Sequence, residues 1–158
     1  MPHTQPPVQA YNRLMAQSFQ RFTQASILGE TDTASLSDAE LARAMFDAPQ
    51  AIVSHGTEAD PIFRYANAAA LKLWEMDWAD FIRLPSRLSA EATADIQSDR
   101  DTLLKAALAK GWVDDYSGIR ISRTGRRFDI QKTVLWNVVD ANDLRHGQAA
   151  FIRSHLYL

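Results

Sequence analysis

The sequence contains no cysteine among its 158 residues. A chain without thiols forms no disulfide, has no thiolate nucleophile, and cannot ligate zinc or an iron–sulfur cluster through sulfur. The absence also excludes a light sensor in which flavin forms a covalent adduct with cysteine. With 46% apolar residues, the chain can instead bury one core without disulfides or a structural metal.

The chain also lacks an excess of charge of one sign and lacks long apolar runs. Its 17 basic and 19 acidic residues give a formal net charge of −2, so no global field attracts nucleic acid or an anionic membrane. We interpret the arginines within residues 120–127 as part of a solvated turn. No segment has the pattern of a membrane span or a secretory signal. We therefore expect a cytoplasmic protein that binds neither nucleic acid nor membrane.

Several motifs of nucleotide-binding proteins and hydrolases are absent as well. There is no Walker phosphate-binding loop, no Gly-x-Gly-x-x-Gly, no His-Glu-x-x-His and no Gly-x-Ser-x-Gly. These absences argue against the commonest nucleotide-dependent and hydrolytic activities.

The N-terminal part of the chain predicts two helices. Residues 1–7 contain three prolines and no periodicity, which predicts a disordered lead-in. Apolar residues then recur every three or four positions over residues 8–27, the spacing of a helix with one buried face, with Gly29 near its end. Ser37 and Glu40 form a capping box that predicts a helix over residues 38–47. We expect residues 8–48 to form a helical extension that packs on the sheet or pairs with a second copy.

Residues 49–158 are expected to form the core domain. Two β-prone runs at 51–54 and 62–65 lead into a helix capped by Asn67, and Ser98 and Gly111 bound a further helix over 99–110. Three β-prone runs follow at 113–122, 126–139 and 148–157. The prediction is an α+β fold, a five-stranded antiparallel sheet with helices on one face, plus the two N-terminal helices.

The second of those three runs has its own face pattern. Its apolar residues alternate so that one set is predicted to cover the core, broken only by Lys132. This set is Phe128, Ile130, Val134, Trp136 and Val138.

Several separated motifs carry a resemblance to a known family. The segment Tyr65-Ala66-Asn67-Ala68-Ala69, at the second strand-to-helix junction, resembles the start of a PAS sensor domain. Together with segments at 53–57, 60–63, 74–78, 84–90 and 115–122, it resembles the MEKHLA domain over about residues 12–153. That family is PAS-like, occurs in bacteria as small stand-alone proteins, and has no established activity. The chain is therefore identified as a bacterial stand-alone member.

The resemblance bears on cofactors, which stay unknown at this point. Haem-binding PAS sensors commonly take an iron ligand from the long helix, and residues 99–110 contain no histidine. The sequence therefore argues against haem, and the missing cysteine argues against adduct-forming flavin chemistry. No metal site is expected.

His55 and Asp60 are the first candidate ligand-binding residues. They lie on either side of a predicted turn that can bring them together. A histidine that titrates near neutral pH beside a carboxylate can anchor a ligand or transfer protons. The alternative is that both side chains only fix the turn through backbone amides.

A second group of candidates combines arginine with aromatic residues. Tyr116 and Arg120 lie four residues apart on one predicted strand and so share a face. With Arg87 and Trp136 they would form a pocket for a planar or carboxylate-bearing molecule, since guanidinium groups bind carboxylates through two parallel hydrogen bonds. The alternative for the arginines is ion pairing with Asp77, Asp80 or Asp115. Asn67 is a further candidate, although its side chain is also suited to cap the helix that follows.

The sequence thus predicts a non-catalytic, PAS-like sensory or regulatory module. We expect it to bind a small molecule, to form a homodimer, or both, and to signal through a separate, unidentified partner. One alternative is a small cone-shaped α+β enzyme that uses His55 and Asp60 as an acid–base pair. The other is a ligand-free interaction module with a filled core.

Overall fold

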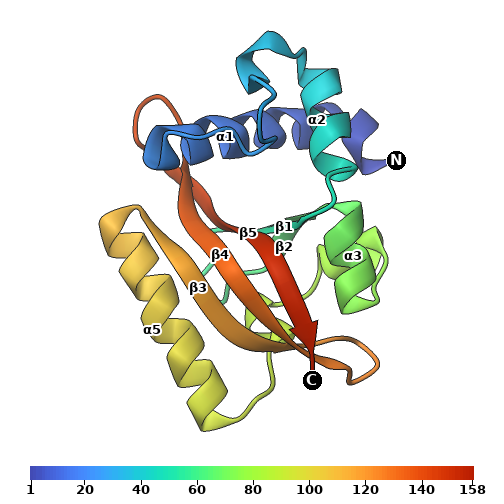
Figure 1. Ribbon diagram of the computed structural model, residues 1–158, viewed down its shortest axis with the longest axis vertical. Helices are drawn as coiled ribbons and strands as arrows, with labels where there is room; N and C mark the ends of the chain where they lie inside the picture. The colour runs from blue at the N-terminus through green and yellow to red at the C-terminus, as the bar shows by residue number, and fades with distance from the viewer.

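The computed structural model describes residues 1–158 and contains one five-stranded antiparallel sheet (Figure 1). The spatial order is β2-β1-β5-β4-β3, so the first and last strands of the chain pair at the centre. The bounds are Ala51–His55 for β1, Phe63–Ala66 for β2, Trp112–Ile121 for β3, Arg127–Val139 for β4 and Arg145–Tyr157 for β5.

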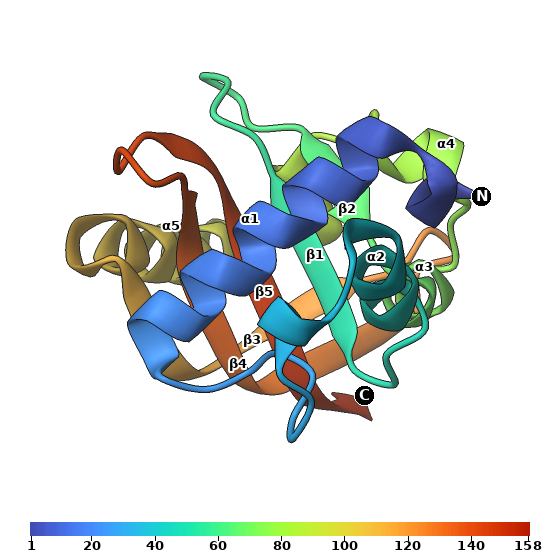
Figure 2. The same ribbon diagram turned by 90° about the horizontal axis from the view of Figure 1, so that it is seen from above.

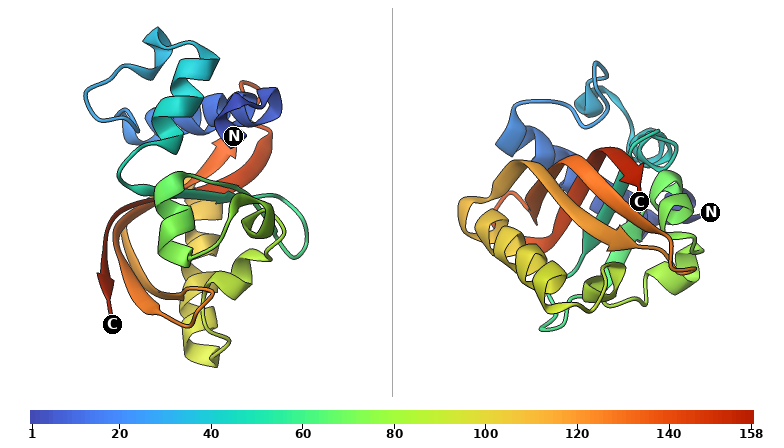
Figure 3. Two further views of the ribbon diagram at one scale, coloured as in Figure 1. Left: turned by 90° about the vertical axis from the view of Figure 1, so that its right-hand side faces the viewer. Right: turned by 60° about the horizontal axis from the view of Figure 1, so that its bottom comes forward.

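Helices cover both faces of this sheet. The α-helices are α1 (Pro6–Thr23), α2 (Asp38–Phe46), α3 (Ala68–Trp74), α4 (Trp78–Phe81) and α5 (Ala94–Lys110), and short 3-10 helices lie at Pro2–Thr4, Thr33–Ser35 and Ser86–Ser89. We call the face under α1 and α2 the outer face and the face under α3 and α5 the inner face. Figure 3 shows α1 and α2 at one end of the molecule and α5 at the other.

The helix predicted over residues 38–47 is confirmed. Ser37 Oγ accepts a hydrogen bond from the Glu40 amide at 3.1 Å, and Glu40 Oε1 accepts one from the Ser37 amide at 2.9 Å. This reciprocal pair satisfies two amides that a helix N-terminus otherwise leaves unpaired. Leu41 and Met45 of this helix are fully buried.

Several predicted boundaries were wrong, among them the end of the helix predicted over residues 8–27, which the structure places at Thr23. Residues 2–4, predicted to be disordered, form a 3-10 helix, and the prolines at 6 and 7 occupy the first turn of α1. Proline is favoured there because its fixed φ suits the first turn and its missing N–H has no helical partner to lose. The long helix α5 is capped by Thr93 rather than Ser98, because Thr93 Oγ1 accepts from the Ile96 amide at 3.4 Å.

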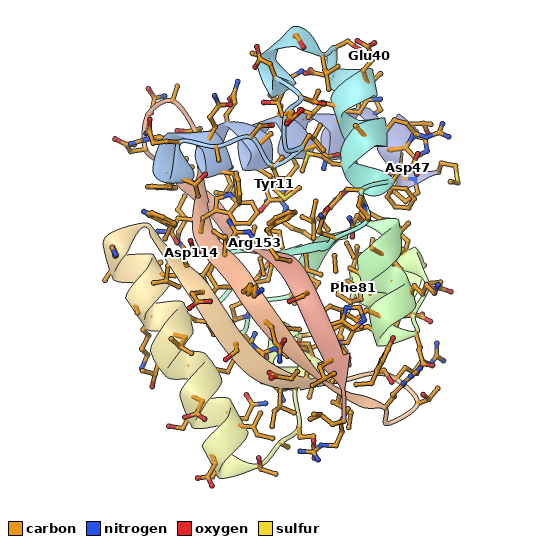
Figure 4. All side chains as sticks on the ribbon, in the orientation of Figure 1. Tyr11, Glu40, Asp47, Phe81, Asp114 and Arg153 are labelled. Atoms are coloured by element: carbon orange, nitrogen blue, oxygen red, sulfur yellow. The ribbon has the colours of Figure 1, made fainter.

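The N-terminal helices pack against the sheet of their own chain. Figure 2 shows α1 lying across β1 and β5. Phe19 of α1 meets Trp136 edge to face at 5.0 Å between ring centres, and Trp136 Nε1 donates to the Met15 carbonyl at 3.2 Å. Tyr11, which Figure 4 labels between α1 and the strands, has its hydroxyl oxygen 2.7 Å from Ser54 Oγ. Of the two roles predicted for these helices, the structure thus shows packing on the sheet.

The predicted single apolar face of β4 was wrong. Phe128 and Ile130 belong to the cluster on the inner face, whereas Val134, Trp136 and Val138 belong to the cluster on the outer face. The change occurs at Lys132, whose φ of 51° lies in the left-handed region and breaks the strict alternation of side chains. As a result β4 supplies apolar side chains to both faces.

We expect α1 to be essential for stability. Replacing the buried Phe19 by alanine should lower the free energy of unfolding by about 3–5 kcal/mol, since it empties a packed site beneath the helix. Replacing the exposed Gln17 of the same helix by alanine should change it by less than about 0.5 kcal/mol. Denaturant unfolding followed by circular dichroism checks both values, and equal stabilities of the two variants would contradict this role of α1.

Candidate functional site

A cavity of about 40 Å³ lies on the inner face of the sheet, between β1, β4 and β5 and the helices α3 and α5. Its walls are mainly apolar and include Phe63, Trp74, Leu104 and Ile130. Its polar residues come from β1, β3, β5, α5 and the 3-10 helix before α5; they are Ser54, His55, Ser89, Arg100, Arg120 and Gln148. We call this the inner cavity.

Arg100 and Arg120 are the two charged residues of the inner cavity, and each is only 6% exposed. Arg100 Nη2 donates to Ser86 Oγ at 2.8 Å, a neutral acceptor. Neither arginine takes part in any of the ion pairs of the protein. Burial and the nearby positive charge of Arg120 lower the pKa of Arg100 to about 10. The cavity therefore holds positive charge that no carboxylate of the chain neutralises by direct contact.

Tyr116 and Arg120 share a strand face, as predicted. Arg120 Nη2 donates to the Tyr116 hydroxyl, and Nη1 donates to the Ile119 carbonyl at 2.8 Å. Gly118, between them in β3, leaves room for this contact. A Cβ at that position would lie 2.9 Å from Arg120 Nη1 and 3.0 Å from the Tyr116 hydroxyl oxygen. The glycine thus allows Arg120 to fold back over Tyr116.

His55 ends β1 and is 8% exposed. Its Nδ1 lies 3.0 Å from the Gly56 carbonyl oxygen, which can only accept, so Nδ1 carries the proton and donates. Nε2 is then a bare acceptor. The Gln148 side chain lies beside it, but its Nε2 donates to the Leu104 carbonyl, so His55 Nε2 is buried without a protein group that donates to it. Burial lowers the pKa of His55 to about 4, and the charge of Arg100 adds to this effect. His55 is consequently a neutral side chain at physiological pH.

The structure does not bring His55 and Asp60 together. No hydrogen bond or ion pair joins them, and Asp60 pairs instead with Arg87 at 3.2 Å. Both side chains of that ion pair are 55% exposed, so it lies at the surface. Arg87 was expected to pair with Asp77, Asp80 or Asp115 if it had a structural role, and its partner is a different aspartate.

Asn67 and Trp136 lie away from the inner cavity. Asn67 Oδ1 accepts from the amides of Ala70 and Ile52, and Nδ2 donates to the carbonyls of Met45 and Gln50. These four bonds use the hydrogen-bonding groups of its fully buried side chain and tie α2, β1 and α3 together. Trp136 packs in the outer cluster under α1.

Sequence reasoning missed Arg100 and Gln148. Arg100 stands among polar neighbours in α5, which suggests an exposed position. Its spacing carries a signal, because Ile96, Arg100, Leu104 and Ala107 follow one another at intervals of four, four and three residues and so share a helix face. Gln148 lies opposite His55 in the β1–β5 pairing, and its Nε2 donates to the Leu104 carbonyl at 3.0 Å.

Other kinds of site receive no support from the geometry. No group of three or more histidine, aspartate and glutamate side chains is placed to hold a metal ion. None of the helices has the length and apolar character needed to cross a bilayer.

The strand order 2-1-5-4-3, with α3 and α5 over the inner face, defines a PAS-like α+β domain. Within that class, the profile of the MEKHLA domain matches residues 9–156, and the chain belongs to the MEKHLA domain family. The matched region includes most of α1 as well as the sheet. Comparison with curated proteins finds no match.

Solved structures confirm the fold. An RNA-binding light-oxygen-voltage receptor is 24% identical with a TM-score of 0.64, over 82% of this chain and 35% of that chain. The present chain thus spans about a third of that receptor. A PAS domain from Colwellia psychrerythraea is 16% identical with a TM-score of 0.60, over 72% and 92% of the two chains. A PAS domain of a LuxR-family regulator from Burkholderia thailandensis, solved with ethanol, is 16% identical with a TM-score of 0.54, over 69% and 92%.

The low pKa of His55 should make stability depend on pH. The unfolded chain protonates its histidine near pH 6.5, whereas the folded protein does so only near pH 4, so the unfolded state binds more protons in between. The contribution of His55 to the free energy of unfolding is therefore fully present above pH 6.5. It decreases as the pH drops toward 4, by up to about 3 kcal/mol.

A His55→Gln variant should lose that part of the pH dependence, whereas His155→Gln, at an exposed position, should keep it. Urea unfolding at a series of pH values between 7 and 4 measures the difference. Parallel curves for the wild type and His55→Gln would show that His55 is not the buried neutral group described here.

Proposed function

We propose that this protein is a non-catalytic, PAS-like sensory module that binds a small molecule in the inner cavity. The observation that carries the proposal is the set of buried polar groups that face an otherwise apolar space without full partners. His55 Nε2 accepts no hydrogen bond and Arg100 has a single one, to Ser86. Unsatisfied buried groups cost free energy, and a ligand that pairs with them removes that cost.

The geometry gives the enzyme alternative little support. An acid–base catalyst works best when its pKa lies near the working pH, and the pKa of His55 is lowered to about 4. The proton on Nδ1 is held by the Gly56 carbonyl, and Asp60 is bound to Arg87. The acid–base pair that would make the site catalytic is therefore not assembled.

The size of the inner cavity favours a ligand of few atoms. One water needs about 10–15 Å³ by this kind of measure, so a cavity of about 40 Å³ takes roughly three waters or an organic molecule of similar size. The ligands named for the structural neighbours differ widely in size. One light-oxygen-voltage domain was studied with a flavin analogue, and one PAS domain was solved with ethanol. The present cavity is closer in scale to ethanol.

A route from the inner cavity to the N-terminal helices runs through β1. Ser54 lines the cavity, and its hydroxyl donates to the Gln148 carbonyl at 2.9 Å. Because that carbonyl can only accept, the Tyr11 hydroxyl of α1 donates to Ser54 Oγ. A ligand that shifts β1 or Gln148 would thus act directly on α1. We place the signalling surface for the unidentified partner on α1 and α2.

Homodimerisation remains a second part of the proposal, with a modified role for α1. The apolar side chains Met15 and Phe19 of α1 are buried on the sheet of the same chain, so they are not free to pair with a second copy. A dimer that keeps this fold would use the exposed surface of the N-terminal helices or another surface. The alternative function, a ligand-free interaction module with a filled core, predicts that no small molecule binds, and the next experiment distinguishes it from the proposed function.

Filling the inner cavity should abolish binding while the fold persists. Ala150→Val adds two methyl groups at the cavity wall, and Ala39→Val, at an exposed site of α2, is the matched control. Natively purified wild type and Ala39→Val should show an additional small mass in native mass spectra that is lost on denaturation. Ala150→Val should show only the mass of the chain, with an unchanged circular dichroism spectrum.

Two results would contradict this proposal. One is the retention of the same small molecule by Ala150→Val. The other is a bare chain mass for the wild type together with a tryptophan emission that no small molecule changes, because Trp74 forms part of the cavity wall.

A further inference from the structure

The strongest unexplained feature of the molecule is the pair of buried guanidinium groups at the inner cavity. Arg100 comes from α5 and Arg120 from β3, and both line the same small space. Two like charges in a poorly hydrated site repel each other and lose solvation, which is why buried charges are normally paired. Here the hydrogen-bond partners are a serine hydroxyl, a tyrosine hydroxyl and a backbone carbonyl, all of them neutral.

The nearby carboxylates are engaged elsewhere or face another space. Asp60 forms its ion pair with Arg87. Asp99 and Asp129 line a neighbouring groove between α5 and β3, which Arg100 and Arg120 also line, but neither carboxylate forms an ion pair with them, and Asp129 accepts a hydrogen bond from Gln131 at 3.1 Å. The inner cavity itself is lined by no acidic residue. An anion inside it would meet both guanidinium groups without displacing an existing ion pair.

His55, the third polar group considered in the cavity, needs a hydrogen-bond donor, whereas the two arginines need an acceptor. Because Nδ1 of His55 carries the proton, Nε2 accepts a hydrogen bond and does not donate one. Its best partner is therefore a hydroxyl or an N–H group. The remaining walls, among them Val53, Phe63 and Ile152, are apolar and suit a short hydrocarbon segment.

We propose that the inner cavity binds a two-carbon hydroxycarboxylate, of which glycolate is the simplest, whose carboxylate contacts Arg100 and Arg120 and whose hydroxyl donates to His55 Nε2. Glycolate is the smallest member of its class and so the one that suits a cavity of about 40 Å³. This inference rests on the proposed function, because it names the ligand class of the same cavity. Guanidinium groups match the flat carboxylate through parallel hydrogen bonds. The bound anion also compensates the two positive charges, so binding and folding stability are coupled.

The test compares ligands that differ in one group each. Glycolate is titrated into the full-length protein at constant ionic strength, alongside 3-hydroxybutanoate, propanoate, glycolamide and inorganic phosphate. Tryptophan emission and the melting temperature are both recorded. Glycolate should bind saturably and raise the melting temperature. Propanoate, in which a methyl group replaces the hydroxyl, and the larger 3-hydroxybutanoate should bind more weakly, and glycolamide and phosphate should give no saturable response.

Variants locate the binding at the two arginines. Arg100→Met and Arg120→Met should each weaken hydroxycarboxylate binding by about 30-fold or more, the usual effect of removing one partner of a buried charged contact. Arg153→Met is the matched control, because Arg153 is exposed and pairs with Asp114 at 3.0 Å, as labelled in Figure 4. Without ligand, Arg100→Met should melt at or above the wild-type temperature, because it removes a buried unpaired charge.

The outcomes separate this inference from the proposed function. If glycolamide or phosphate binds as tightly as glycolate, or if both arginine variants bind glycolate as tightly as the wild type does, the ligand class is wrong and a cavity-binding module still stands. If none of the carboxylates binds, the ligand class is also wrong. The proposed function itself fails only by the results of the cavity-filling experiment. The comparison of acid with amide uses the unmodified protein, so it holds even if a variant does not fold.

Discussion

The rest of the structure depends on the antiparallel pairing of β1 with β5. This pairing joins residues that are about a hundred positions apart and aligns Val53 with Ala150, Ser54 with Ala149 and His55 with Gln148. The same two strands form a wall of the inner cavity and support α1 on the other face. Because successive side chains of a strand point to opposite faces, a slip of one residue would exchange these two environments. The inner cavity and the packing of α1 on the outer face therefore depend on the same register of β1 and β5.

The inner cavity combines features that a purely structural core avoids. Protein interiors are close-packed, and their buried polar groups are hydrogen-bonded. Here an apolar space contains a histidine with a free acceptor and two arginines without carboxylates. Other buried polar groups differ among themselves, since Asn67 makes four hydrogen bonds whereas Asn12, Tyr65 and Asn137 also keep buried side-chain atoms without a partner. What points to a ligand is that the unpaired acceptor of His55 and the two arginines line one and the same cavity.

Sequence patterns predicted the fold because it depends on local signals, and they predicted the site less well because it depends on long-range geometry. The capping box at Ser37 and Glu40 acts within one helical turn, so the sequence alone predicts where this helix begins. The left-handed backbone at Lys132 could not, because a lysine gives no local sign of positive φ. Arg100 reaches Ser86 and the strands only after α5 docks on the sheet, so its spacing hinted at burial but not at a partner. The resemblance to the MEKHLA family supplied the class and left the ligand open.

The most direct test of the account is a crystal structure of natively purified protein at a resolution that defines the contents of the inner cavity. The account predicts a small organic molecule with a carboxylate within hydrogen-bonding distance of Arg100 and Arg120, and a donor group beside His55 Nε2. A cavity that contains only water, with Asp99 or Asp129 turned to pair with the two arginines, would contradict it. In that case the arginines would serve the fold, and the function would have to be sought on the surface of α1 and α2.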